Sequence, residues 1–235
     1  MALLHWDESG QRLYETGVDK VVLYPMLANN EYGKGIAWNG VTGVTENPEG
    51  AEANDIYADN IKYLSLISAE NWKASLKAYN SPIEFAPMQG EIEFNNNLTL
   101  TSSVRGVFFG QQKRKKFAIS WRSLVGNDSL GDAYAYKIHI AYGLSAAPSE
   151  RDHATVNDSP EATEFSWELS SIPVAVNTQF YIGGESKTIK PVSHIVFNSY
   201  DNDTIIQKLE NILWGSVSAD ATCPLPDALI RDLKL

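Results

Sequence analysis

Apolar and polar residues alternate along several segments of the chain, with the period of two that is typical of a β-strand with one buried face. The strongest alternation runs through residues 132–142, where tyrosine or isoleucine occupies every second position from 134 onward. The same period appears at 71–79, 115–123 and 164–170. Each of these three segments carries a tryptophan in register with its apolar face, namely Trp72, Trp121 and Trp167. The pattern predicts strands whose tryptophans belong to the core.

Further strand-like runs are separated by polar turns. They lie at 20–27, 36–45, 62–68, 105–110 and 191–199. Pro25 places the first of them at a sheet edge or a bend, because proline cannot donate to a ladder. Strands at this spacing indicate an antiparallel β-sandwich or a barrel-like fold.

One segment has the period of a helix. Residues 204–214 place five apolar side chains on one stripe, and Gly215 stands at the expected end. Thr204 with Gln207 has the form of a capping box at the start. The predicted fold class is therefore mainly β with a flanking α-helix.

Two shorter helical turns are also expected. Ser81, Pro82 and Glu84 have the spacing of a second capping box, with proline at the first helical position. Pro226 opens a turn near the C-terminus.

The length of 235 residues, with 43% hydrophobic and 20% charged residues, fits a globular domain with one sizeable core. No repeat, linker or low-complexity tract stands out. The simplest division is an N-terminal arm at 1–18, a β domain at 19–215, and a C-terminal arm at 216–235.

The chain is acidic, with 29 acidic against 19 basic residues and a formal charge of −10. Such a surface repels phosphate, which argues against a protein that grips nucleic acid but not against one that lets DNA pass. The N-terminus reaches charged residues before any apolar segment of signal-peptide length, and no apolar run approaches a membrane span. We expect a protein that is synthesised and kept in a cytoplasm, without a membrane partner.

Residues 46–63 form the most acidic stretch. Between Val41 and Asn60 they carry no base and five acids: Glu46, Glu49, Glu52, Asp55 and Asp59. Charge runs of this kind are usually solvated loops. The alternative is a connector between two strands that meets another subunit.

The opposite charge gathers at Lys113, Arg114, Lys115 and Lys116. A solvated turn is the ordinary interpretation, and four bases in an acidic chain make only a weak nucleic-acid patch. An acidic and a basic patch on different faces of one subunit also fit head-to-tail association, which closes rings or builds filaments. We hold the pairing of this basic turn with the acidic stretch as a hypothesis.

Residues suited to catalysis form no recognisable motif. The histidines are His5, His139, His153 and His194, and none stands at metal-ligand spacing from another. No Gly-x-Ser-x-Gly elbow or phosphate-binding glycine loop is present. Cys223 is the single cysteine, expected to be a small packed side chain. The sequence therefore assigns no catalytic, cofactor-binding or metal-binding residue, and the protein is not expected to be an enzyme.

Several short segments of the sequence resemble segments of the major tail proteins, or tail tube proteins, of bacteriophages with long non-contractile tails. The first is Pro48–Glu52 followed by Tyr57–Leu64. Others follow in the same order between about Gly17 and Leu229: 111–114, 121–128, 136–142, 154–162, 165–168, 213–215 and 224–227. The chain departs from the family's pattern at Ser170-Ser-Ile-Pro173, where a threonine-rich segment before the proline is expected.

The resemblance implies a structural virion protein, synthesised in the host bacterial cytoplasm, whose subunits form hexameric rings stacked into a tail tube. Strands of neighbouring subunits would then complete a barrel around a lumen through which DNA passes without specific binding. Implied partners are other copies of the chain, the tape measure protein, and the tail terminator and distal tail proteins. The residues expected at inter-subunit contacts are Glu46, Glu49, Glu52, Asp55, Tyr57, Asp59, Lys113, Arg114, Lys115 and Lys116. The alternative is a carbohydrate-binding or adhesin-like β-sandwich module, and a hydrolase is the most distant possibility.

Overall fold

The computed structural model describes residues 3–94, 106–149, 151, 153, 155, 162–182, 184–201 and 203–234. One expected strand begins at Arg105, which lies outside the described residues. Most of the tail-protein-like segment at 154–162 also lies outside them.

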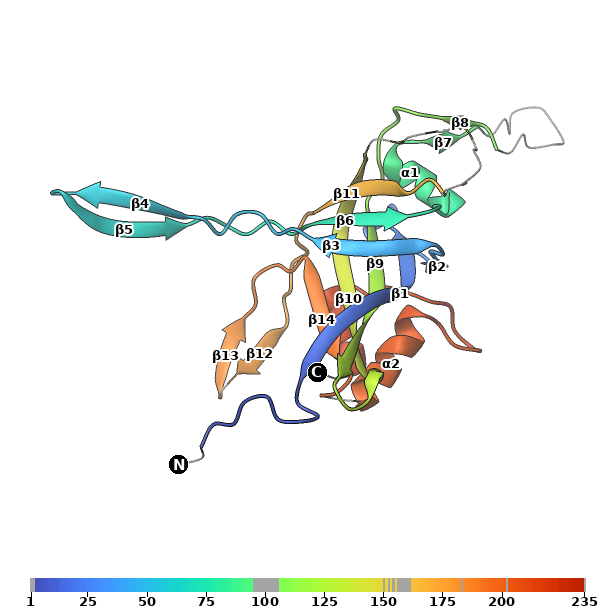
Figure 1. Cartoon of the computed structure of the whole chain (residues 1–235). Helices are drawn as coiled ribbons and strands as arrows, with labels where there is room; N and C mark the ends of the chain where they lie inside the picture. The colour runs from blue at the N-terminus through green and yellow to red at the C-terminus, as the bar shows by residue number, and fades with distance from the viewer. Residues whose placement is uncertain are drawn as a thin grey trace.

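The described part of the chain is built mainly of antiparallel strands, with a few short helices (Figure 1). The strands are β1 (Leu13–Pro25), β2 (Ile36–Ala37), β3 (Val41–Glu46), β4 (Ala53–Ala58), β5 (Ile61–Ile67), β6 (Lys73–Ala78), β7 (Ile92–Glu93), β8 (Phe108–Phe109), β9 (Phe117–Asn127), β10 (Gly131–Pro148), β11 (Phe165–Ser171), β12 (Gln179–Ile182), β13 (Glu185–Thr188) and β14 (His194–Asn198). The helices are η1 (Ile83–Phe85), α1 (Ala86–Gln89), α2 (Asp203–Leu213) and α3 (Pro226–Leu233). The predicted fold class is confirmed.

The main sheet has the order β2-β1-β9-β10-β11-β6-β3, and β14 also pairs with β10. The long strand β10 divides it into two layers, because residues 137–141 pair with β14 and residues 144–148 pair with β11. Gly143 lies between these two parts with φ +62°, and a Cβ there would come within 2.2 Å of the Ile172 carbonyl oxygen. Glycine thus permits the close approach at the point where β10 passes from one layer to the other.

The two layers enclose an aromatic core. Trp167 is almost fully buried and packs edge-on against Trp38 and Phe85, with ring centroids 5.4 and 5.5 Å apart. Trp72 and Trp121 are buried in the same cluster. The prediction that these three strand tryptophans are core residues is confirmed.

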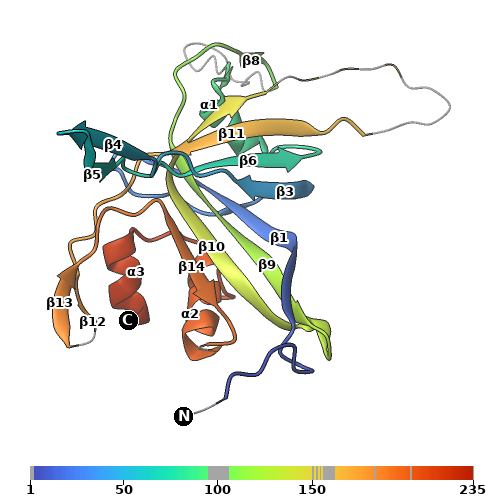
Figure 2. The ribbon, with the colours of Figure 1, turned by 60° about the vertical axis from the view of Figure 1, so that its left-hand side comes forward.

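A second core lies on the other side of the β1-β9-β10-β14 layer, where Figure 2 shows α2 and α3 beside β14. Ile206, Leu209 and Leu213 of α2 are buried there, as are Leu229 and Leu233 of α3. The C-terminal segment therefore contributes core residues. Cys223 is buried with them, as expected, and burial raises the pKa of its thiol. None of the described helices is long and apolar enough to cross a membrane.

The expected helix caps are wrong in detail. α2 begins at Asp203, so Thr204 lies inside the helix and cannot act as its N-cap. At the other site η1 follows Pro82 as N-cap, without a side-chain cap, so Ser81 and Glu84 form no capping box. The helices themselves are present, and Gly215 follows α2 with φ +79°.

Two strand boundaries also differ from expectation. The run at 36–45 is split into β2 and β3, because the chain turns at Asn39 and Gly40. The strand expected from Lys20 begins at Leu13, inside the segment expected to be an arm. Register shifts at Thr16/Asp19 and Asp19/Val22 interrupt the alternation, which hid the first half of β1 from a search for period two.

Candidate functional site

The acidic stretch is a β-hairpin that projects away from the rest of the chain (Figure 1). Its strands β4 and β5 pair with each other and with no other described strand. Asp59 and Asn60 connect them with φ values of 51° and 62°. Two successive residues with positive φ are the mark of a type I′ turn, the favoured two-residue hairpin connection. The expectation of a loop is therefore wrong, and the connector is an ordered hairpin.

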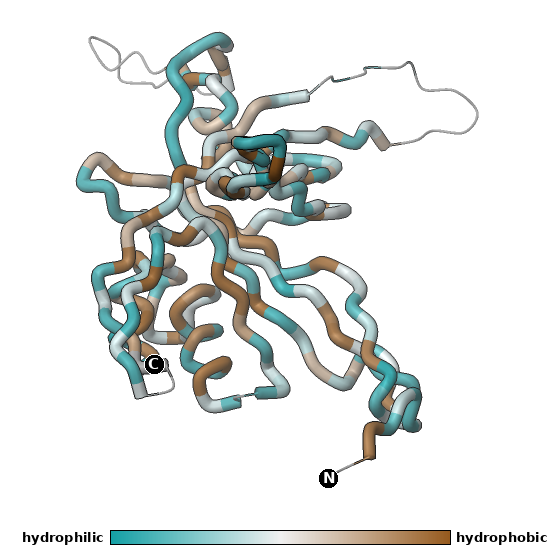
Figure 3. The backbone as a smooth tube through the Cα atoms, turned by 90° about the vertical axis from the view of Figure 1, so that its left-hand side faces the viewer, coloured by the Kyte–Doolittle hydropathy of each residue, from teal (hydrophilic) through white to brown (hydrophobic). Residues whose placement is uncertain are grey.

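Apolar side chains cover this hairpin and are exposed. In Figure 3, where the hairpin points toward the viewer, apolar segments lie on it beside polar ones. Tyr63 is 68% exposed and Ile67 is 72% exposed. The other large exposed apolar side chains of the hairpin are Ile56, Tyr57, Ile61, Leu64 and Leu66. An isolated two-stranded hairpin is marginally stable in water, and an apolar surface of this kind marks an interaction site.

The acids of the hairpin have separate environments. Asp55 accepts from Lys62 at 2.8 Å and from Ser65 at 2.7 Å, and these bonds lower the pKa of its carboxyl. At the root, Glu49 lies 2.5 Å from the Lys73 ammonium. Glu52 and Asp59 are exposed and have no ion pair within the described residues. Only these last two remain as exposed, unneutralised charges for a partner.

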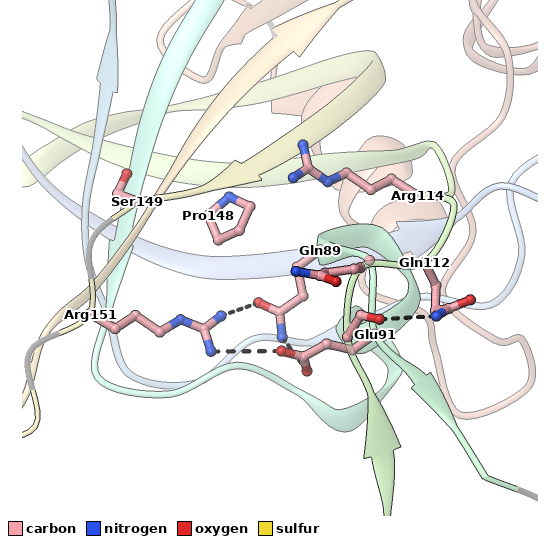
Figure 4. A pocket seen from close by; sticks show the side chains of 10 residues that line it. Gln89, Glu91, Gln112, Arg114, Pro148, Ser149 and Arg151 are labelled. Atoms are coloured by element: carbon pink, nitrogen blue, oxygen red, sulfur yellow. Dashed lines mark hydrogen bonds and ion pairs between the residues drawn. The ribbon is translucent and has the colours of Figure 1, made fainter.

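The basic turn Lys113–Lys116 precedes β9 on the part of the molecule that carries α1. Its side chains make no ion pair within the described ranges, so the contact with the acidic stretch stays a prediction. Arg114 lines one side of a polar cleft of about 720 Å³ (Figure 4). On the other side Arg151 donates to Gln89 Oε1 at 2.6 Å and lies 3.8 Å from Glu91. Arg114 is therefore the cation of this cleft that is free to meet a carboxylate.

Glu46, by contrast, turns away from the hairpin. It is the last residue of β3, and Trp72 Nε1 donates to its Oε2 at 3.2 Å. The same oxygen lies 3.4 Å from His194 Nδ1 on β14, and Oε1 lies 3.8 Å from His139 Nδ1 on β10. The structure thus removes Glu46 from the projecting part of the hairpin and brings it to a polar cluster beside the core.

Burial favours the neutral form of both histidines of this cluster. Burial lowers the pKa of His139 to about 4, and it lowers the pKa of His194 as well. Trp121 lies flat against both imidazoles, with interplanar angles of 6° and 5°. Both histidines are therefore packed side chains, and their spacing along the sequence gave no sign that they lie side by side.

That neighbourhood could not be found from the sequence, because Glu46, His139 and His194 stand on three strands that only the sheet topology brings together. The hairpin, however, could have been predicted from a local signal in the sequence. Asp59 and Asn60 are residue types that tolerate positive φ, and they lie between two apolar runs.

No family model and no curated protein matches the chain. Among solved structures, it is similar to a chain of the anti-feeding prophage baseplate, determined by cryo-electron microscopy with six-fold symmetrisation. The identity is 11% over 83% of this chain and 97% of that chain, with a TM-score of 0.31.

Proposed function

We propose that this chain is the tail tube subunit of a long-tailed bacteriophage, which assembles into stacked hexameric rings and forms a conduit for DNA in the virion tail. The observation that carries the proposal is the projecting β4–β5 hairpin with its exposed apolar side chains. Two of the sequence segments that resemble tail tube proteins, 48–52 and 57–64, lie in or next to this hairpin. A protein without partners would expose this surface at a cost and without use.

The free energy available from burying the hairpin side chains is large enough to support a contact with another subunit. Fully burying one exposed isoleucine or leucine side chain contributes about 1.5–3 kcal/mol. Four of the hairpin residues buried against a neighbour would therefore contribute about 6–12 kcal/mol, which is comparable with the cost of association, about 4–15 kcal/mol. The partner that fits best is a second copy of this chain, because β3 pairs only with β6 among the described strands and leaves its outer edge open. An added strand from a like subunit would satisfy that edge.

The net charge of −10 suits a channel for DNA. An acidic wall repels the phosphate backbone and offers no counterion-releasing grip, so DNA would pass without specific binding. The tape measure, tail terminator and distal tail proteins are the further partners that this function requires. The tryptophans with which a carbohydrate-binding module would stack sugars on its strands, Trp72, Trp121 and Trp167, are buried, so they do not favour that alternative.

The test is assembly of the purified full chain, followed by negative-stain electron microscopy and analytical ultracentrifugation. The wild-type chain should form rings or hollow tubes as its concentration rises. The double variant Ile61→Ser, Ile67→Ser should remain a monomer with an unchanged circular dichroism spectrum, because both side chains are exposed on the hairpin. Val217→Ser, at a fully exposed site between α2 and α3, is the matched control and should assemble normally.

A wild-type chain that stays monomeric at high concentration would contradict the proposal, as would rings formed equally well by the double variant. In the same assay, Lys113→Glu with Lys115→Glu tests the basic turn. Weaker assembly of a folded chain would support its contact with an acidic neighbour, and unchanged assembly would exclude that contact.

A further inference from the structure

Three side chains with metal-ligating atoms converge from three strands. Glu46 ends β3, His139 lies within β10 and His194 begins β14, and one ligand atom from each lies within 4.8 Å of the other two. The closest pair is His139 Nδ1 and His194 Nε2, at 3.2 Å. This cluster has no part in the proposed assembly surface, and the inference below does not rest on the proposed function.

The outer nitrogen of His139 already has a partner. The Ser123 hydroxyl donates to Glu15 Oε1 at 2.6 Å, so its oxygen accepts from His139 Nε2 at 2.9 Å. This partner favours the tautomer of His139 with a lone pair on Nδ1, the nitrogen that faces His194. Both nitrogens of His194 face the cluster, with Nε2 3.2 Å from His139 Nδ1 and Nδ1 3.4 Å from Glu46 Oε2.

His194 Nε2–H donates to the lone pair of His139 Nδ1 across 3.2 Å. A metal ion can take the place of this proton, because neutral imidazole nitrogens and a carboxylate are the ligands that bind zinc. An acceptor on the second ring nitrogen, as Ser123 provides for His139, is also the usual companion of a metal-bound histidine.

The spacing fits a tetrahedral ion. With bonds of about 2.05 Å, two nitrogens at the tetrahedral angle lie about 3.3 Å apart, close to the separation seen here. Glu46 Oε1 lies 3.8 Å from His139 Nδ1, and one ligand atom from each of the three residues lies within 4.8 Å of the other two. We propose that His139 Nδ1, His194 Nε2 and Glu46 Oε1 bind one divalent transition-metal ion, with Zn²⁺ as the best match, and that solvent completes its coordination.

The ion's role is structural. Glu46 belongs to the layer β3-β6-β11, whereas His139 and His194 belong to the layer β1-β9-β10-β14. Coordination would therefore link the two layers at the residue from which the chain leaves for the hairpin. The flat face of Trp121 covers both imidazoles, and Trp72 Nε1 orients the carboxylate. The ligands are thus held in place by packed neighbours.

The experiment uses the untagged full chain, stripped with a chelator and titrated with Zn²⁺ by calorimetry and with Co²⁺ by visible absorption. One ion should bind per chain, Zn²⁺ should raise the midpoint of thermal unfolding, and Co²⁺ should give the d–d bands of a tetrahedral site. Glu46→Gln and His194→Gln should each weaken binding about 100-fold or more. Ser123→Ala, which keeps all three ligands, should weaken it about 10–100-fold by releasing the His139 tautomer.

The matched control is His5→Gln, since His5 is an exposed histidine that also lies beside a carboxylate, 3.4 Å from Glu8. It should bind Zn²⁺ as the wild type does. Glu46 is partly exposed, so Glu46→Gln keeps the test valid if His194→Gln fails to fold. Absence of binding to the folded wild-type chain, or equal affinity in the wild type and Glu46→Gln, would overturn the proposal.

Discussion

The strands β9 and β5 are both rich in apolar residues, yet one is almost wholly buried and the other is exposed at every position. The difference lies in what surrounds them. β9 is covered on one face by the β3-β6-β11 layer and on the other by the core that includes α2 and α3. β5 pairs only with β4, and no described layer covers either face of the hairpin. Apolar sequence therefore does not by itself indicate a core, and an uncovered apolar hairpin indicates a missing partner.

A second hairpin sharpens this comparison. β12 and β13 also form a two-stranded sheet of their own, but the start of β12 is tied to α3. Asp227 of α3 accepts from the backbone N–H groups of Asn177 and Thr178 and from both of their side chains, at 2.8–3.1 Å. Within the described residues, the β4–β5 hairpin has no such carboxylate anchor beyond its root, so the proposed contact with a neighbouring subunit would have no such bond to break.

The largest expected effect distinguishes core from hairpin directly. Trp167→Ala should lower the free energy of unfolding by about 3–5 kcal/mol, because it leaves a cavity between Trp38 and Phe85 and removes one of the two hydrogen bonds to Gln89 Oε1. Ile67→Ala should change it by less than about 0.5 kcal/mol, because the side chain is 72% exposed. Urea denaturation at a concentration where both variants are monomeric provides the measurement. A similar loss for Ile67→Ala would mean that the hairpin packs on its own chain.

The core side of this comparison could be predicted from the sequence, because alternation is a local signal. Trp72, Trp121 and Trp167 each stand in register with other apolar residues of one strand, so period two suffices to place them. The stripe of α2 is likewise local. Where a bulge breaks the period, as at Asp19 in β1, the same reasoning fails.

The candidate sites were less accessible from the sequence. The hairpin's position in space depends on which strands have partners, and Tyr63 or Ile67 would be equally suited to a core strand. The cluster of Glu46, His139 and His194 depends on the way β10 joins two layers, which no spacing encodes. The acidity of residues 46–59 was visible, but the separate environments of Glu46 and Asp55 were not.

A smaller effect is expected where the second hairpin is anchored. Asp227→Asn should lower the free energy of unfolding by about 1–2 kcal/mol, since it removes charge-assisted bonds to Asn177 and Thr178. Amide exchange at these two residues should also become faster. Asp232→Asn is the control on the same helix, because Asp232 pairs only with the adjacent Arg231 among the described residues. Equal losses for both variants would contradict the anchoring role.

The same carboxylate predicts a pH dependence. Hydrogen bonds from Thr178, foremost its backbone N–H, and from Asn177 lower the pKa of Asp227 in the folded chain. Its stabilising contribution is therefore present above the pKa of an unfolded aspartate, about 3.9, and is lost as the pH falls through the lower folded value. Urea denaturation between pH 5 and pH 2 should show a steeper loss for the wild type than for Asp227→Asn.

The smallest effect concerns the β4–β5 turn, and it tests whether the hairpin holds its shape before any partner covers it. Asn60 has φ +62°, a conformation that glycine adopts more readily, so Asn60→Gly should favour the closed hairpin by about 0.5 kcal/mol, or about twofold. Amide exchange in β4 and β5 of the monomer should slow by that factor, while the free energy of global unfolding stays unchanged. Asn30→Gly, at another turn residue with φ +63°, should leave exchange in the hairpin as it was. If Asn60→Gly instead raised the global free energy of unfolding, the hairpin would unfold together with the core, and the contrast between the covered and uncovered strands would lose its energetic basis.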